Sequence, residues 1–232
     1  YCTDAVTPIM RQTYDAARGS AECALTGARE LLRGRDAAYA LCRPSGHHAG
    51  PRVFGGYCYF NNTALAVNLL STTGRVATLD LDYHHGNGTQ EFFAQRADVL
   101  TCSIHGDPHV EYPYYWGYSN ERGKGLAAGS NLNLPLPLGT DDDAYLRTLD
   151  KACRAIHRFK PRHLVIGCGV DTYKDDPIGG FALTLEAYPQ IGARIARLGL
   201  PTLFCQEGGY NRKALGRCVH RVLQGFSQQR SR

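Results

Sequence analysis

Apolar, strand-like runs alternate along this chain with stretches in which apolar residues recur at the spacing of an α-helix. The pattern predicts strands over 38–42, 76–82, 99–105, 131–136, 163–171 and 201–209. It predicts helices over 8–32, 62–71, 89–95, 142–158, 184–198 and 213–226. Strands separated by helices need crossover connections, which make the strands parallel and cover both faces of their sheet. We therefore predict an α/β fold, a single domain of three layers (α/β/α) around a mostly parallel central sheet.

Composition and charge narrow the class of protein. The 232 residues are 43% hydrophobic and 20% charged, which suits one sizeable core and excludes a disordered chain. The formal net charge of +5 is small, and the basic residues are scattered except in the final stretch QQRSR (228–232). Because no basic stripe is present in the sequence, we expect no nucleic-acid partner.

Cysteine usage and the chain start indicate a compartment. Nine cysteines, an odd number, lie mostly inside apolar runs such as YALC and VIGCGV, as buried thiols do in a reducing compartment. The sequence has no CxxC pair, no signal peptide and no apolar run long enough to cross a bilayer. We expect a cytoplasmic protein that is not bound to a membrane. The chain begins YCTDAVTP, without an initiator methionine, and we expect it to be N-terminally incomplete.

Unusual polar residues are concentrated where four of the predicted strands end. The segments are RPSGHHAG (43–50), LDLDYHHGNG (79–88), GCGVDTYKDDP (167–177) and CQEGGYN (205–211). In parallel α/β sheets, ligands bind beyond the carboxyl ends of the strands. We therefore expect all four segments to face one crevice.

Asp82, His84 and Asp171 are the candidate metal ligands. Carboxylates and imidazoles at the end of a buried strand need a partner, because an unpaired buried charge is costly. If the strand stays extended, Asp80, Asp82 and His84 share one side of it. Two carboxylates and one histidine leave a coordination position open, as in catalytic zinc sites. Two alternatives remain open: a hydrogen-bonded structural network around Asp82, and a turn cap at Asp171.

The adjacent residues His47 and His48 follow another predicted strand in a glycine-flanked turn. Histidine changes charge near neutral pH, so two neighbouring rings beside carboxylates suit proton transfer. Tyr210 follows Gly208 and Gly209, where a flexible turn would let its phenol reach over the crevice. The alternative for Tyr210 is a tyrosine that caps a loop.

Five motifs together resemble a known family. RPSGHHA, GGYCYFNN, LDLDYHHGNGTQ, GVDTYKDDP and QEGGYN are similar to the ordered motifs of the arginase–deacetylase fold, specifically of the zinc-dependent histone deacetylase superfamily. The stretch SIHGDPHVEYPYYWGYSNERGKG resembles the acetylpolyamine amidohydrolase branch more than the histone-directed enzymes. The resemblance covers nearly the whole chain. It implies that residues 1–232 form a deacetylase catalytic domain that lacks its N-terminal segment.

The resemblance also implies roles for single residues. It places one zinc ion on Asp82, His84 and Asp171. It makes His47 and His48 the proton-transfer pair and Tyr210 the polariser of the substrate carbonyl. Two supporting residues are implied, with Asp80 holding His47 and Asn87 orienting His48 in place of the acid that many relatives have there.

Further implied sites are a structural K⁺ site and a substrate channel. The K⁺ site maps to Asp80, Asp82, His84, Ser103 and Ile104, mostly through backbone oxygens. The substrate-binding residues map to Gly56, Tyr57, Tyr112 and Gly208. Aromatic walls pack well against the methylene groups of an acyl-lysine or acylamine chain.

The predicted activity is zinc-dependent hydrolysis of an acetyl-amide bond, which releases acetate and a free amine. The loop 105–125 combines aromatic residues with Asp107, Glu111 and Glu121, a mixture that attracts cations and favours an acetylpolyamine or another small acetylamine. Alternatively, its tyrosines pack the loop itself or the interface of a homodimer. Alternatives for the function are an acetyl-lysine protein deacetylase, an inactive relative that binds acetylated ligands, and arginase-like hydrolysis with two manganese ions.

Overall fold

The computed structural model of the chain describes residues 1–231, which form one sheet and six α-helices. The strands are β1 (Ala37–Ala40), β2 (Val76–Asp80), β3 (Val99–Gly106), β4 (Asn131–Leu136), β5 (His163–Cys168) and β6 (Thr202–Gln206). The helices are α1 (Thr13–Leu32), α2 (Asn62–Leu70), α3 (Asn87–Phe93), α4 (Asp142–Phe159), α5 (Ala187–Ala196) and α6 (Leu215–Arg230), with short 3₁₀ turns η1 (Ser71–Thr73) and η2 (Gly125–Ala127).

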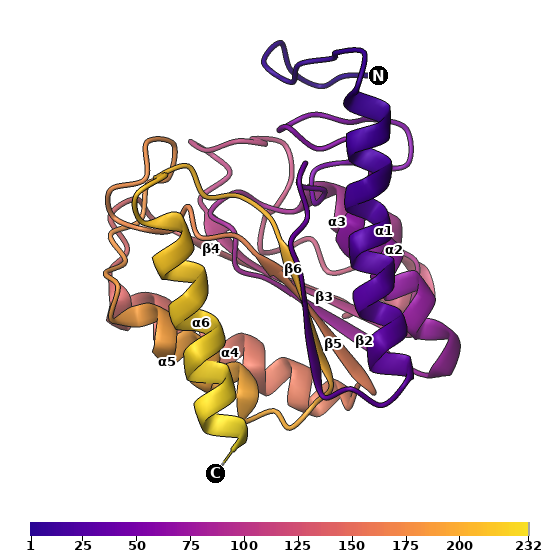
Figure 1. Ribbon diagram of the computed structural model, residues 1–232, viewed down its shortest axis with the longest axis vertical. Helices are drawn as coiled ribbons and strands as arrows, with labels where there is room; N and C mark the ends of the chain where they lie inside the picture. The colour runs from indigo at the N-terminus through magenta and orange to yellow at the C-terminus, as the bar shows by residue number, and fades with distance from the viewer. Residues whose placement is uncertain (232) are drawn as a thin grey trace.

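The sheet has six strands in the order β1-β6-β5-β2-β3-β4, and every pair of neighbours is parallel. Figure 1 shows α1 and α2 on one side of the sheet and α4, α5 and α6 on the other. Each face has its own apolar cluster, built around α4–α6 on one side and around α1–α3 on the other. The predicted three-layer α/β/α architecture is confirmed, and the sheet is wholly rather than mostly parallel.

Helix α4 shows how the sequence directs local structure. The side chain of Asp141 caps its first turn by accepting a hydrogen bond from the Ala144 N–H at 2.8 Å. Tyr145 and Ile156 lie on the buried face of the helix, toward the sheet. The helix ends at Phe159, and the next residue, Lys160, adopts the left-handed conformation (φ 53°) that commonly closes a helix. Burying each large apolar side chain of this face contributes about 1.5–3 kcal/mol.

The strand order places a topological switch between β2 and β5. From β2 the chain proceeds outward through β3 and β4, whereas β5 and β6 lie on the opposite side of β2. Both β2 and β5 are completely buried, because helices cover both faces of the sheet. Ligands of such sheets bind in the crevice beyond the carboxyl ends of the strands at the switch point. The segments after β2 and β5 therefore border that crevice.

Several predicted boundaries were wrong at the polar ends of the strands. Strand β2 stops at Asp80 rather than at residue 82, β5 stops at Cys168 rather than at 171, and β6 stops at Gln206 rather than at 209. There the backbone leaves the ladder and donates its N–H groups to buried carboxylates instead. Helix α1 begins at Thr13, not at residue 8.

The cysteines agree with the sequence expectation. Cys42, Cys102, Cys168 and Cys205 are buried free thiols, as their apolar surroundings predict. Within residues 1–231, every helix is too short or too polar to cross a membrane.

Candidate active site

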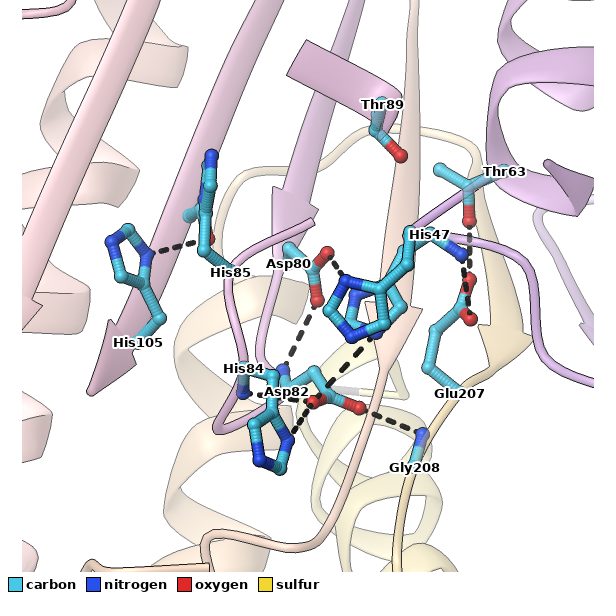
Figure 2. Close-up of polar contacts among 12 residues, drawn as sticks. His47, Thr63, Asp80, Asp82, His84, His85, Thr89, His105, Glu207 and Gly208 are labelled. Atoms are coloured by element: carbon cyan, nitrogen blue, oxygen red, sulfur yellow. Dashed lines mark hydrogen bonds and ion pairs between the residues drawn. The ribbon is translucent and has the colours of Figure 1, made fainter. Parts of the chain in front are cut away.

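Asp82, His84 and Asp171 meet at the switch point between β2 and β5. The Nδ1 atom of His84 lies 2.9 Å from Oδ2 of Asp171 and 3.4 Å from Oδ1 of Asp82. One donor atom from each residue lies within 4.8 Å of the other two, and all three residues are buried. We call this group the floor of the site; Figure 2 shows His84 turned toward Asp82.

Backbone N–H groups hold the floor in place. Oδ2 of Asp82 accepts a hydrogen bond from the Gly208 N–H at 2.7 Å, and Oδ1 accepts one from the His84 N–H at 2.9 Å. Asp171 accepts from the Tyr83 N–H at 2.8 Å. The segment after β2 is therefore not extended, as the alternation argument assumed, but wraps its amides around the carboxylates.

Close approach at the floor requires a residue without a side chain. A Cβ atom on Gly169 would lie 2.1 Å from Oδ2 of Asp82, and one on Gly208 would lie 2.6 Å from the same oxygen. Because both neighbours are glycine, the ends of β5 and β6 approach Asp82 directly. Gly208 thus holds the floor through its N–H group, and it is not among the residues that line the pocket described below.

The electrostatics of the floor suit a divalent ion. Burial, together with the charge of Asp82, raises the pKa of Asp171 to about 7. Burial opposes the charging of His84, but hydrogen bonds to Asp171 and Asp82 raise its pKa to about 10. Two buried carboxylates that repel each other beside an imidazole nitrogen form a donor set of the kind that zinc takes in proteins. The residues present therefore fit a metal ion.

His47 and His48 lie beside the floor, with ring centroids 4.0 Å apart. His47 Nδ1 pairs with Asp80 Oδ2 at 2.9 Å, and His48 Nδ1 pairs with Asn87 Oδ1 at 2.8 Å. Burial opposes protonation of His47, but the charges of Asp82 and Asp80 raise its pKa well above the usual value. Burial and the neighbouring His47 lower the pKa of His48 well below it. The two histidines thus have opposite tendencies to hold a proton.

Glu207 anchors the loop that carries His47 and His48, a role that was not predicted from the sequence. Its Oε2 accepts hydrogen bonds from the Gly46 and His47 N–H groups at 2.8 and 3.2 Å, and its Oε1 accepts from the Thr63 hydroxyl at 3.0 Å (Figure 2). Burial raises the pKa of Glu207 to about 7. The residue lies in the segment 205–211 that the sequence singled out, but its partner segment is remote along the chain. No local spacing signals that contact.

A pocket of about 210 Å³ opens above the floor. Its lining residues are Asp4, Val6, His48, Gly56, Tyr57, His84, Tyr112, Ile178 and Tyr210. Gly56, Tyr57 and Tyr112 were predicted as channel residues and do line the pocket, whereas Asp4 and Ile178 were missed. His48 of the predicted proton-transfer pair and Tyr210, the predicted polariser of the carbonyl, border the same space.

Gly56 and Tyr112 bracket His48 within this pocket. Gly56 has φ 55°, and a Cβ atom on it would lie 2.2 Å from Cδ2 of His48. The ring of Tyr112 meets that of His48 edge to face at 4.9 Å. Also in the wall, the ring centroids of Tyr57 and Tyr210 lie 6.0 Å apart. The pocket is therefore walled by aromatic rings, and its shape depends on a glycine.

The first residues of the chain complete the wall of the pocket. Oδ2 of Asp4 accepts a hydrogen bond from the Gly56 N–H at 2.6 Å, while Oδ1 accepts from the Val6 and Thr7 N–H groups. The Thr3 N–H donates to the Phe54 carbonyl at 2.8 Å. An aspartate side chain that accepts hydrogen bonds from the N–H groups two and three residues later forms an Asx turn. The sequence from Asp4 to Thr7 is compatible with such a turn, so this contact could have been predicted locally.

The loop 105–125 contributes less to the pocket than predicted. Among its residues, Tyr112 alone lines the pocket. Tyr115 is 80% exposed. Glu121 accepts hydrogen bonds from the Gly117 N–H within the loop and from the Gln90 side chain of α3, so its carboxylate links the loop to that helix. The expected aromatic and acidic wall was wrong in this respect, because the loop folds onto its own backbone.

The residues of the predicted K⁺ site lie on β2, on the loop after it and on β3. Asp80 and Ser103 face each other in the register of β2 and β3. Ser103 Oγ lies 3.1 Å from Nδ1 of His85 and 2.8 Å from Nδ1 of His105. Burial lowers the pKa of His105 to about 4. The cation assignment remains a prediction.

Residues 1–226 match the family model described as the histone deacetylase domain. The chain belongs to the histone deacetylase family. This family membership confirms the resemblance on which the sequence analysis relied.

Three relatives define the neighbourhood of this family member. The chain is 52% identical to acetylpolyamine amidohydrolase 1 of Pseudomonas aeruginosa, over 97% of this chain and 66% of the relative. It is 39% identical to histone deacetylase 8 of Arabidopsis thaliana, over 81% of this chain and 53% of the relative. The crystal structure of an acetylpolyamine aminohydrolase from Burkholderia pseudomallei superposes with a TM-score of 0.96 at 44% identity, covering 97% of this chain and 66% of that one. The chain thus spans about two thirds of the length of the acetylpolyamine relatives.

Proposed function

We propose that this family member is a zinc-dependent amidohydrolase that removes the acetyl group from acetylpolyamines or other small acetylated amines. The observation that carries this proposal is the convergence of Asp82, His84 and Asp171 beneath a pocket that His48 and Tyr210 border. The similarity to the acetylpolyamine amidohydrolase of P. aeruginosa supports the substrate class. In this proposal the described residues act as a deacetylase catalytic domain in the cytoplasm, with the K⁺ site as a structural addition.

The floor residues would hold zinc, with Asp82, His84 and Asp171 as ligands. Bound there, zinc would supply Lewis acidity toward the acetyl carbonyl and lower the pKa of water. Asp80 keeps the His47 ring in place through its hydrogen bond to Nδ1. These contacts hold the floor residues and the His47 ring in position before a substrate binds.

His48 takes the proton of the attacking water in this scheme. Its Nδ1 is engaged by Asn87, which leaves Nε2 for the water, and its ring borders the pocket whereas that of His47 does not. The water oxygen forms a bond with the acetyl carbon, and the developing oxyanion accepts a hydrogen bond from the hydroxyl of Tyr210. The carbon–nitrogen bond then breaks, and the amine takes a proton back from the histidine pair. The products are acetate and the free amine.

The pocket favours a slender substrate. Its aromatic walls, Tyr57 and Tyr112, suit the methylene groups of an alkyl chain. Asp4 places a carboxylate in the wall, where it attracts a second, cationic nitrogen on the same chain. Both features fit an acetylated polyamine. The second candidate substrate is acetyl-lysine in a protein, which the similarity to the Arabidopsis histone deacetylase 8 favours.

The test has two parts, carried out on the purified protein. Metal analysis is expected to give one equivalent of zinc, and acetate release is expected from N-acetylputrescine and from an acetyl-lysine peptide. In direct competition, we expect the higher kcat/KM for N-acetylputrescine. A higher kcat/KM for the peptide would identify acetyl-lysine in proteins as the substrate class, and the proposed hydrolytic mechanism would be unaffected. A protein that binds zinc and both substrates without releasing acetate would instead be a binding relative.

A further inference from the structure

Asp176, a buried carboxylate outside the floor, accepts hydrogen bonds from the backbone at Tyr210. Oδ2 of Asp176 accepts hydrogen bonds from the N–H groups of Tyr210 and Asn211 at 2.7 and 3.0 Å. Its Oδ1 accepts one from the Ile178 N–H at 3.1 Å. Asp176 is 8% exposed, so little water competes for these bonds. Hydrogen bonds from N–H groups to an ionised carboxylate are stronger than those between neutral groups.

Asp176 joins the two loops that carry the proposed catalytic groups. It belongs to the loop after β5, which also carries the floor residue Asp171, whereas Tyr210 belongs to the loop after β6. The side chain of Asn211 adds a second link between these loops by donating to the carbonyl of Asp175 at 2.8 Å. The relative position of floor and tyrosine therefore depends on contacts between these loops.

The backbone around Tyr210 needs such an anchor. Gly209 has φ 141°, a conformation that residues with a side chain rarely adopt. Because glycine has no side chain, this position can sample many other backbone conformations in the unfolded chain. The ring of Tyr210 projects into the pocket, where open space borders it. Restraint of its hydroxyl therefore comes mainly through the backbone, and Asp176 supplies that restraint.

We propose that Asp176 is a positioning residue that sets the place of the Tyr210 hydroxyl over the floor. The proposal rests on the proposed function, since it concerns the group assigned to the oxyanion. Asp176 does not touch the pocket space, so its effect should act on turnover and not on substrate binding.

The first experiment is Asp176→Asn. The variant replaces one acceptor oxygen with an NH₂ group that cannot receive the N–H groups of the loop. We expect kcat for N-acetylputrescine to fall by up to about 10²-fold, as a misplacement of about 1 Å can produce, with KM nearly unchanged. Zinc content should stay at the wild-type value. The matched control is Asp175→Asn, which removes the same charge at the exposed neighbouring position and should retain wild-type kcat.

A double-mutant cycle separates positioning from a general structural role. If Asp176 acts through the tyrosine hydroxyl, Asp176→Asn should have little further effect on kcat once Tyr210→Phe has removed that hydroxyl. Equal losses of kcat in both backgrounds would overturn the proposal. A wild-type protein that releases no acetate from either substrate would contradict the proposed function itself, which keeps the two failures distinct.

A second variant keeps the proposal testable if Asp176→Asn does not fold. Asn211→Asp retains the Oδ1 atom that accepts from Lys213 and Ala214, but loses the donor to the Asp175 carbonyl. We expect a smaller fall in kcat with unchanged KM, and this fall should disappear in the Tyr210→Phe background. A loss that persists there, or a rise in KM alone, would contradict the coupling of the two loops to Tyr210.

Discussion

The floor of the site and the rim of the pocket are built in different ways. At the floor, Asp82 and Asp171 are almost fully buried, and their oxygens accept hydrogen bonds from N–H groups of two separate segments, one after β2 and one after β6. At the rim, formed by residues 1–7, 54–57 and 107–118, the chain contacts itself through a few hydrogen bonds at partly exposed positions. Tyr115 of this rim is 80% exposed.

This difference separates chemistry from selectivity. A buried carboxylate cannot change its partners without a large energetic penalty, so the floor tolerates little variation. Loops at a pocket mouth can change length and sequence while the sheet beneath them stays intact. We therefore expect substitutions at the floor to remove turnover or metal, and substitutions at the rim to alter KM. Four predictions test this division.

The largest effect is expected at the floor. Asp171→Ala removes one of three donors and leaves His84 without its 2.9 Å partner. Zinc retention and acetate release should both be lost, as measured by metal analysis and by substrate turnover. A variant that keeps a full equivalent of zinc would show that Asp171 is a turn cap and not a ligand.

Tyr210→Phe should have the next largest effect. The substitution keeps the ring beside Tyr57 and removes only the hydroxyl. We expect kcat to fall by about 10²–10³, as on loss of one oxyanion donor, with an unchanged melting temperature. Steady-state kinetics and thermal unfolding measure the two quantities. Wild-type turnover would assign Tyr210 to loop capping.

Gly56 lies where rim and floor meet, and Gly56→Ala should lower both the stability of the protein and its turnover. The alanine would have to adopt the backbone angle φ of about 55° that Gly56 has, and its methyl group would clash with the His48 ring. The left-handed conformation alone destabilises alanine by about 1–2 kcal/mol. Each kcal/mol lowers Tm by about 2–4 °C in a chain of this size. Calorimetry should show that fall together with a reduced kcat; Gly19→Ala, where a Cβ meets no atom within 4 Å, is the control.

The smallest effect is expected for Asp4→Asn at the rim. Removing the carboxylate should raise KM for N-acetylputrescine by up to about fivefold, since exposed charge pairs contribute about 0.2–1 kcal/mol. KM for the neutral N-butylacetamide should rise less, and added salt should reduce the difference between the two substrates. Glu22→Gln, an exposed charge on α1 outside the pocket, is the control. Equal changes for both substrates would mean that Asp4 shapes the wall without attracting the cation.

Much of the fold follows from local pattern. Periods of two and of about 3.6 residues identify strands and helices, and crossover connections then require a parallel sheet. Boundaries failed where the backbone turned toward carboxylates, as after Asp80, because that choice depends on partners from distant segments. Glu207 was missed for the same reason, since its partners His47 and Thr63 lie far away along the chain.

The sequence by itself determined which groups stand at the ends of the strands, namely the paired histidines, the acids of the LDLDYHH segment and the glycines beside them. These are properties of neighbouring residues, and they can be recognised in the sequence at the end of each apolar run. Only the tertiary structure decided that β5 lies beside β2, which brings Asp171 to His84. It also decided that the first residues of the chain close the pocket wall through Asp4. Both outcomes depend on how distant segments pack against each other, and local periodicity carries no information about that.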